Sequence, residues 1–152
     1  LIEGRVDWNE VFSTQIRPVT GADASDVLTF SRNPLTGNVV LESSDYLFVR
    51  MHLSYLNVSS LFYFGHKLEL PGIAAINVNL QLGGNDTVMN NAELPSVVST
   101  GSGDDVIVGG ALFDVLNGES GNDLYLAVGD GPDVILTQPG DYSFNDPFDY
   151  RL

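Results

Sequence analysis

Short apolar runs separated by turn-forming residues recur along the whole chain. Runs such as DVLTF, YLFVRMHL, INVNLQL and DVIV are rich in β-branched and aromatic residues, and Gly, Pro, Asn and Asp stand between them. This alternation is typical of short strands joined by tight turns, so the sequence predicts an all-β protein. Val6–Thr14 and Tyr46–Leu56 are also compatible with short helices, although the second stretch fits an alternating strand equally well.

An internal repeat occupies the second half of the chain. Aspartates recur with spacings of 19, 9, 9 and 10 residues, at Asp86, Asp105, Asp114, Asp123 and Asp133. The second residue after each aspartate is large and apolar: Val88, Ile107, Leu116, Tyr125 and Ile135. A period near nine that doubles to 18 or 19 predicts a parallel β-solenoid in which each coil contains two repeats. The apolar residue after each aspartate is then expected to point into the core.

Stacked coils would place the aspartates of alternate repeats above one another. Parallel strands lie about 4.8 Å apart, so facing carboxylates repel by about 1 kcal/mol in water and by several times more beside an apolar core. A divalent cation midway between them would lie about 2.4 Å from each carboxylate, which matches Ca–O distances better than Mg–O distances. The donors are all oxygen atoms, which favours calcium over zinc or copper.

The charge balance and the missing cysteines exclude several functional classes. The chain has 20 acidic and 6 basic residues, and residues 101–152 contain ten acids but a single base. This argues against nucleic acid and anionic membranes as partners. Without cysteine there are no disulfides, thiolate metal sites or Cys nucleophiles. No apolar run is long enough for a membrane-spanning helix. His52 and His66 stand without a catalytic motif, so we expect no enzyme.

Four segments resemble the calcium-binding nonapeptide of the RTX (repeats-in-toxin, hemolysin-type) family, G-G-x-G-x-D-x-U-x with U apolar. They are GSGDDVIV (101–108), GGALFDVLN (109–117), GESGNDLYL (118–126) and GDGPDVIL (129–136). LGGNDTV (82–88) looks like a degenerate first copy, and residues 21–41 are similar to the β-rich segment that precedes such arrays. The resemblance implies a right-handed parallel β-roll, Ca²⁺ at the turns, and a secreted or cell-surface bacterial protein. The tail FNDPFDYRL is loosely similar to a type I secretion signal.

The resemblance also implies which residues hold the metal. It pairs Asp105 with Asp123, with Asp86 one coil before them, and on the opposite side it pairs Asp114 with Asp133. Glycines of the same turns complete the expected sites: Gly101, Gly103, Gly109, Gly118, Gly121 and Gly131. The Asp105/Asp123 pair keeps the pattern best. On the other side Leu112 replaces a glycine and an insertion at Val128–Asp130 is expected to break the register. In the 19-residue step from Asp86 to Asp105, Pro95 or Ser96 occupies the position where the repeat would have an aspartate.

The chain divides into four segments and leaves two functions open. Residues 1–5 contain IEGR, which resembles a Factor Xa site introduced by cloning; residues 6–72 form a β-rich lead-in, 73–136 the β-roll and 137–152 a tail or cap. One hypothesis is a calcium-binding module that folds outside the cell. The other is a glycan- or protein-binding module that uses the aromatic β surface of residues 40–80, with calcium as scaffold. Turn chemistry without metal would also explain Gly and Asp at these positions.

Overall fold

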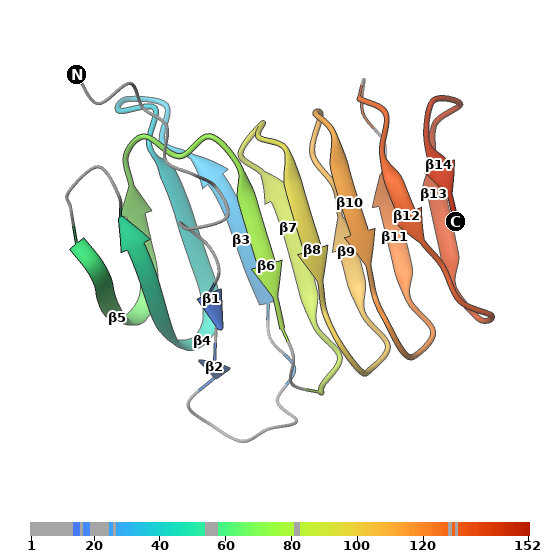
Figure 1. The fold of residues 1–152 in the computed structure, drawn as a ribbon, viewed down its shortest axis with the longest axis horizontal. Helices are drawn as coiled ribbons and strands as arrows, with labels where there is room; N and C mark the ends of the chain where they lie inside the picture. Colours follow the sequence, from blue (N-terminus) through green and yellow to red (C-terminus); the bar gives the residue numbers. More distant parts are fainter. Residues whose placement is uncertain are drawn as a thin grey trace.

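A single chain winds two largely parallel sheets into a solenoid (Figure 1). The computed structural model describes residues 14–15, 17–18, 25, 27–53, 58–80, 83–127, 129 and 131–152, and the side chains of residues 25, 27–43, 67–80, 83–127, 129 and 131–152. These residues form fourteen strands and no helix. The parallel part makes about four turns, which confirms the predicted all-β solenoid.

The two helical alternatives have different outcomes. Tyr46–Leu53 belongs to the long strand β4 (Val39–Leu53), so the strand interpretation is correct there. Apart from Thr14, the stretch Val6–Thr14 lies outside the described residues, as does the 1–5 segment. A helix with the length and apolar character needed to span a membrane does not occur in the described part of the chain.

Each coil of the solenoid contributes one strand to sheet A and one strand to sheet B. Sheet A runs in the order β1 (Thr14–Gln15), β6 (Ile76–Asn79), β8 (Ser96–Ser99), β10 (Asp114–Asn117), β12 (Val134–Leu136), β14 (Tyr150–Arg151). Sheet B runs β13 (Tyr142–Asn145), β11 (Leu124–Ala127), β9 (Val106–Val108), β7 (Thr87–Asn91), β3 (Val27–Arg32), β4, β2 (Arg17–Pro18), and β5 (Val58–Leu70) pairs with β4. From β6 onward the chain alternates between the sheets, so every connection lies at one of two edges.

We call these edges edge 1 and edge 2. Edge 1 contains the turns that lead from sheet A to sheet B, whose described residues are 80, 83–86, 100–105, 118–123 and 137–141. Edge 2 contains the turns that lead from sheet B to sheet A, whose described residues are 71–75, 92–95, 109–113, 129, 131–133 and 146–149. The turn between β3 and β4 also lies at edge 2, because β3 runs parallel to β7. Edge 2 is the upper edge in Figure 1.

At its N-terminal end the solenoid continues into antiparallel strands. β3 is parallel to β7 on one side and antiparallel to β4 on the other, and β4 and β5 form a long hairpin. The side chains of residues 44–66 lie outside the described part, and most of the aromatic surface considered for residues 40–80 falls there. A contact between that surface and a ligand therefore stays a hypothesis.

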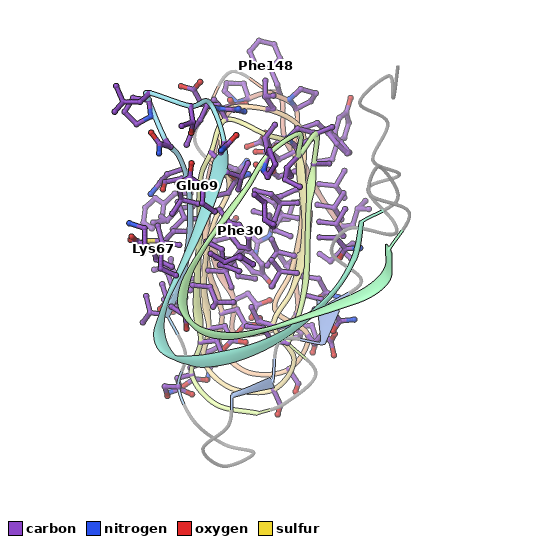
Figure 2. All side chains as sticks on the ribbon, turned by 90° about the vertical axis from the view of Figure 1, so that its left-hand side faces the viewer. Phe30, Lys67, Glu69 and Phe148 are labelled. Carbon is purple, nitrogen blue, oxygen red and sulfur yellow. The ribbon has the colours of Figure 1, made fainter. Side chains whose placement is uncertain are left out.

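The core lies between the two sheets and is built from stacked columns of inward side chains. The residues predicted to point inward, Val88, Ile107, Leu116, Tyr125 and Ile135, are each 0% exposed. Phe30 lies among them, between the two sheets seen end-on in Figure 2. Each fully buried side chain of this kind contributes about 1.5–3 kcal/mol, so the alternation of apolar and turn residues is what closes the coil.

The last coil reverses this pattern. Ser143 pairs with buried Tyr125, Asn145 with buried Ala127 and Arg151 with buried Ile135, so polar residues occupy the core positions. The outward positions carry exposed apolar residues, among them Tyr142 and Phe144. A polar final repeat ends a solenoid core because it presents no apolar surface to a further coil.

Candidate metal centre

Aspartates form a hydrogen-bonded column along edge 1. The backbone N–H groups of Asp86, Asp105 and Asp123 each donate to a carboxylate Oδ1 one coil further on, at 2.7, 2.9 and 3.0 Å. The acceptors are Asp105, Asp123 and Asp141, and the separations are 19, 18 and 18 residues. The expected stacking of Asp86, Asp105 and Asp123 is present, and Asp141 continues it.

A second column runs along edge 2. The N–H groups of Ser96, Asp114 and Asp133 donate to Oδ1 of the next aspartate at 2.8, 2.8 and 3.0 Å, the last acceptor being Asp149. Ser96 thus occupies the position that lacks an aspartate. The separations of 18, 19 and 16 residues are absorbed in the turns. The expected break after the insertion does not occur, because Val115 still pairs with Val134.

These columns give each aspartate a structural role that the sequence pattern did not reveal. A carboxylate that accepts an N–H bond from the neighbouring coil fixes the stacking of the turns, and such charge-assisted bonds are stronger than neutral ones. Asp141 and Asp149 were not among the predicted positions. Their turns, TQPGD and DPFD, lack the glycine two residues before the aspartate, although an aspartate 18 or 16 residues after its predecessor was a usable signal.

The second carboxylate oxygen distinguishes Asp105 and Asp123 at edge 1 from Asp114 at edge 2. Asp114 is saturated: Oδ2 accepts from Gly110 N at 2.6 Å, and Oδ1 accepts from Ser96 N, Ser96 Oγ and, at 3.4 Å, Asn90 Nδ2. By contrast, Oδ2 of Asp105 and Oδ2 of Asp123 are buried without any hydrogen-bond partner, and the two side chains are 1% and 0% exposed. No other buried side-chain oxygen or nitrogen of the described residues lacks a partner.

Backbone conformation four residues before each of these three aspartates accounts for this difference. At edge 2 that residue is Gly110, which has no positive φ and gives its N–H to Asp114. At edge 1 the equivalent residues, Gly101 and Glu119, have φ of 103° and 68°. The Glu119 N–H is given to Asn117 Oδ1 at 3.1 Å, so it does not reach Asp123. The left-handed residues Gly101 and Glu119 therefore accompany the unpaired oxygens of Asp105 and Asp123.

Both columns end with the same closing pattern. In the last coil, Asp141 Oδ2 accepts from Gln138 N at 2.7 Å while the Asp141 N–H donates to Gln138 O. Asp149 does the same with Asp146, whose N–H donates to Oδ2 at 2.8 Å. In the earlier coils the aspartate N–H donates to the next coil. The N–H groups of Asp141 and Asp149 donate within their own turns instead, so the columns end there.

The predicted glycines are needed by the close stacking of the turns. A Cβ on Gly103 would lie 1.7 Å from Gly84 O, and one on Gly121 would lie 1.7 Å from Gly103 O; both residues have positive φ. A Cβ on Gly118 would lie 2.0 Å from Asp123 Oδ2, so this glycine leaves room beside the unpaired oxygen.

At edge 2 the glycines meet different neighbours. A Cβ on Gly109 would lie 2.8 Å from Asp114 Oδ2, and one on Gly131 would lie 2.7 Å from the Leu112 carbonyl carbon. Leu112, which replaces a glycine of the pattern, has no positive φ and so does not need the left-handed conformation that favours glycine.

Burial raises the pKa of several column aspartates. Desolvation is the main cause at Asp114, where hydrogen bonds from Ser96 and Gly110 oppose it. Desolvation also raises the pKa of Asp123, and the neighbouring Asp105 and Asp141 charges add to the shift. At Asp133 desolvation raises the pKa from 3.8 to about 7, with further contributions from Asp114 and Asp149. A cation or a proton would therefore stabilise these carboxylates.

Tyr125 contributes a polar contact that its apolar position did not predict. Its side chain extends from sheet B toward sheet A. There its hydroxyl accepts a hydrogen bond from Gly118 N at 2.8 Å and donates one to Leu136 O, in β12, at 3.0 Å. Burial raises the pKa of Tyr125 to about 12. The hydroxyl therefore joins the two sheets at edge 1, beside the turn that holds Asp123.

The donors at edge 1 suit a hard cation. Two buried, unpaired carboxylate oxygens on consecutive coils carry concentrated negative charge, which calcium and magnesium bind through oxygen ligands. The described residues hold no group of three or more His, Cys, Asp or Glu side chains arranged around one point. Further ligands would therefore have to be backbone carbonyls or water. Asp105 and Asp123 are the best candidates, whereas Asp114 has no oxygen left unpaired.

Comparison with known proteins adds no assignment, because no protein-family model, no curated protein and no solved structure matches this chain. The fold and the columns of buried aspartates are therefore the basis for any statement about function.

Proposed function

We propose that the protein is a calcium-binding β-roll module, similar to those of RTX proteins, with its principal site at Asp105 and Asp123 on edge 1. The observation that carries the proposal is the pair of buried, unpaired Oδ2 atoms on consecutive coils. Leaving a buried anionic oxygen unpaired costs several kcal/mol, and a bound divalent cation removes that cost.

Two other features support calcium over an unligated acidic stack. The chain has a formal net charge of −14, so self-repulsion opposes the compact state until cations bind. The repeat matches the family nonapeptide at its aspartates and its apolar positions. Binding free energy then adds to folding free energy, by about 2.7 kcal/mol when calcium exceeds its Kd 100-fold.

The same reasoning gives the setting and the role of the module. Extracellular calcium sites commonly bind in the range of about 0.1–1 mM, so a weak site on a roll would be filled outside a cell and empty inside it. We therefore place the module in a secreted or cell-surface protein, where calcium completes its folding. Its role is structural rather than enzymatic.

The test is a calcium titration by calorimetry with parallel melting curves in calcium and in chelator. For a chain of this size, the expected gain corresponds to a rise in Tm of about 5–10 °C. The double variant Asp105→Asn/Asp123→Asn keeps both Oδ1 acceptors and removes the charges. It should lose the calcium-dependent rise, and in chelator it should melt above the wild type because two buried charges are gone.

The matched control is Asp104→Asn/Glu119→Gln, which removes two exposed charges from the same turns. It should keep the rise in calcium. Equal wild-type melting curves in calcium and in chelator would sink the proposal, as would loss of binding in the control but not in the Asp105/Asp123 variant.

A further inference from the structure

Exposed apolar side chains gather along edge 2. Leu112, Phe113 and Phe148 are 46%, 47% and 69% exposed, and Leu35, in the neighbouring turn between β3 and β4, is 94% exposed. Phe148 projects from the top of the molecule in Figure 2, away from the core. The described turns of edge 1 contain no exposed large apolar residue. The two edges therefore differ in surface chemistry as well as in hydrogen bonding.

Aromatic rings and prolines alternate along this edge. The residues directly before Ser96, Asp114, Asp133 and Asp149 are Pro95, Phe113, Pro132 and Phe148, and they occupy equivalent positions on successive coils. Phe113 and Phe148 are thus two coils apart, about 9.6 Å at the spacing of parallel strands. We call the row Leu112, Phe113, Pro132 and Phe148 the apolar ridge.

A pocket opens beside the ridge at the start of sheet A. It has a volume of about 280 Å³ and is lined by Ala74, Ala75, Ile76, Pro95, Ser96, Val97 and Phe113. Ala74 and Ala75, which lie on an earlier coil, have small side chains, so they leave an open space beside the Phe113 ring. The volume lies just below the range of drug-sized ligand pockets, so the pocket fits one large apolar side chain.

Negative charge flanks the ridge. Glu93 is exposed, and Asp146 and Asp149 lie in the turn that carries Phe148. Hydrogen bonds from Asn33, Thr36 and Asn38 lower the pKa of Glu69 and keep it anionic at the same edge. The guanidinium of Arg32 donates to Ala92 O and Gly37 O, so it is occupied by backbone carbonyls.

This charge selects among the candidate occupants. A second copy of the chain offers 12 acids and a single base, Arg151, over residues 83–152, so its roll would be repelled. Anionic lipid would be repelled for the same reason. An uncharged glycan could donate hydroxyl hydrogen bonds to the flanking carboxylates but would leave their charge unpaired. A segment that combines apolar residues with Lys or Arg complements both features of the edge.

We propose that the apolar ridge binds a basic, proline-rich segment of a partner protein in the polyproline II conformation. That helix repeats every three residues, about 9.3 Å, which matches the two-coil distance between Phe113 and Phe148. Prolines three residues apart would pack on the two rings, as in other aromatic recognition surfaces for such segments. A neighbouring large side chain would enter the pocket, and Lys or Arg would face Glu93 and Asp146.

The ridge and the proposed calcium site are on opposite edges, so the inference does not rest on calcium ligation. The test uses the full chain in calcium buffer, with β-type circular dichroism as a check on folding. The probe is a short synthetic peptide with proline at every third position and arginines at both ends, and its binding is followed by fluorescence anisotropy at low and at physiological salt.

The decisive variants exchange exposed aromatic residues only. Phe113→Ser/Phe148→Ser should weaken binding at least about tenfold, the loss typical of two interface anchors. Tyr142→Ser/Phe144→Ser removes two residues of similar exposure, 72% and 62%, outside the ridge and should leave the affinity unchanged. Ala74→Phe, which fills the pocket from an exposed position, should also weaken binding.

Peptide controls test the two parts of the argument. Replacing the prolines by alanine, or the arginines by glutamate, should abolish binding. The proposal is wrong if both double variants bind equally, if the alanine peptide binds as tightly as the proline peptide, or if binding is unaffected by charge reversal. It is also wrong if neutral β-linked oligosaccharides bind in a Phe113-dependent way while the peptide does not.

Discussion

At edge 1 and at edge 2, aspartates hold consecutive coils together, but the hydrogen bonding of their second carboxylate oxygen differs. On both edges a backbone N–H reaches an aspartate Oδ1 one coil away. The turns of edge 1 pass through left-handed residues, and Asp105 and Asp123 keep an unpaired oxygen there. At edge 2, Gly110 N and Asn90 Nδ2 donate hydrogen bonds to the Asp114 carboxylate, so both of its oxygens are paired.

The difference is the basis for the two functions that we propose for the two edges. A turn that leaves a buried carboxylate oxygen unpaired can be stabilised by a cation or a proton without any change in the backbone. A turn that satisfies its own carboxylate has no such need, and its outer positions are free to carry Phe and Leu. The sign of φ four residues before the aspartate therefore distinguishes Asp105 and Asp123, which keep an unpaired oxygen, from Asp114, which does not.

The largest loss of stability is expected when a side chain is added to one of the stacked glycines of edge 1. Gly121→Ala would place a methyl group 1.7 Å from Gly103 O at a residue with φ of 149°. Strain and overlap together should cost about 3 kcal/mol or more in the free energy of unfolding, measured by urea denaturation. At edge 2, the methyl group of Gly110→Ala would meet Asn90 Nδ2 at 2.9 Å, and Gly110 has no positive φ, so this change should cost clearly less. A larger loss at Gly110 would contradict the comparison.

A second test uses pH in calcium-free buffer. The folded-state pKa of Asp133 is raised from 3.8 to about 7, so the folded protein binds more protons than the unfolded chain between these values. Stability should therefore fall as pH rises from about 4 to about 7, seen as a falling Tm. Asp133→Asn, which keeps an Oδ1 acceptor for the Asp114 N–H, should flatten the slope. A stability that rises over this range would contradict the raised pKa.

The smallest effect is expected from Tyr125→Phe. The change leaves Gly118 N and Leu136 O without their partner at edge 1, and it should cost about 1–3 kcal/mol in unfolding free energy. Tyr142→Phe removes a hydroxyl from a side chain that is 72% exposed and serves as the control. Equal denaturation midpoints for the two variants would show that the hydroxyl does not join the sheets.

Much of the fold could be read from the repeat, and much of the site could not. The alternation of aspartate and apolar residue predicts coil length, stacking and the five core residues, because a solenoid imposes one period on the whole segment. The expected pairing of Asp105 with Asp123 also follows from that period. Asp141 and Asp149 were missed because their turns lack the glycine pattern, yet the hydrogen-bond columns include them.

The sequence by itself determined that this chain forms stacked β coils with an aspartate at each turn, since spacing alone sets which residues recur on one face. The tertiary structure decided which carboxylates remain unpaired. That outcome depends on backbone dihedral angles at Gly101, Gly110 and Glu119 and on side chains from other coils, such as Asn90. The nonapeptide pattern places an aspartate in the turns of both edges, whereas the direction of a single N–H is fixed only when neighbouring coils pack together.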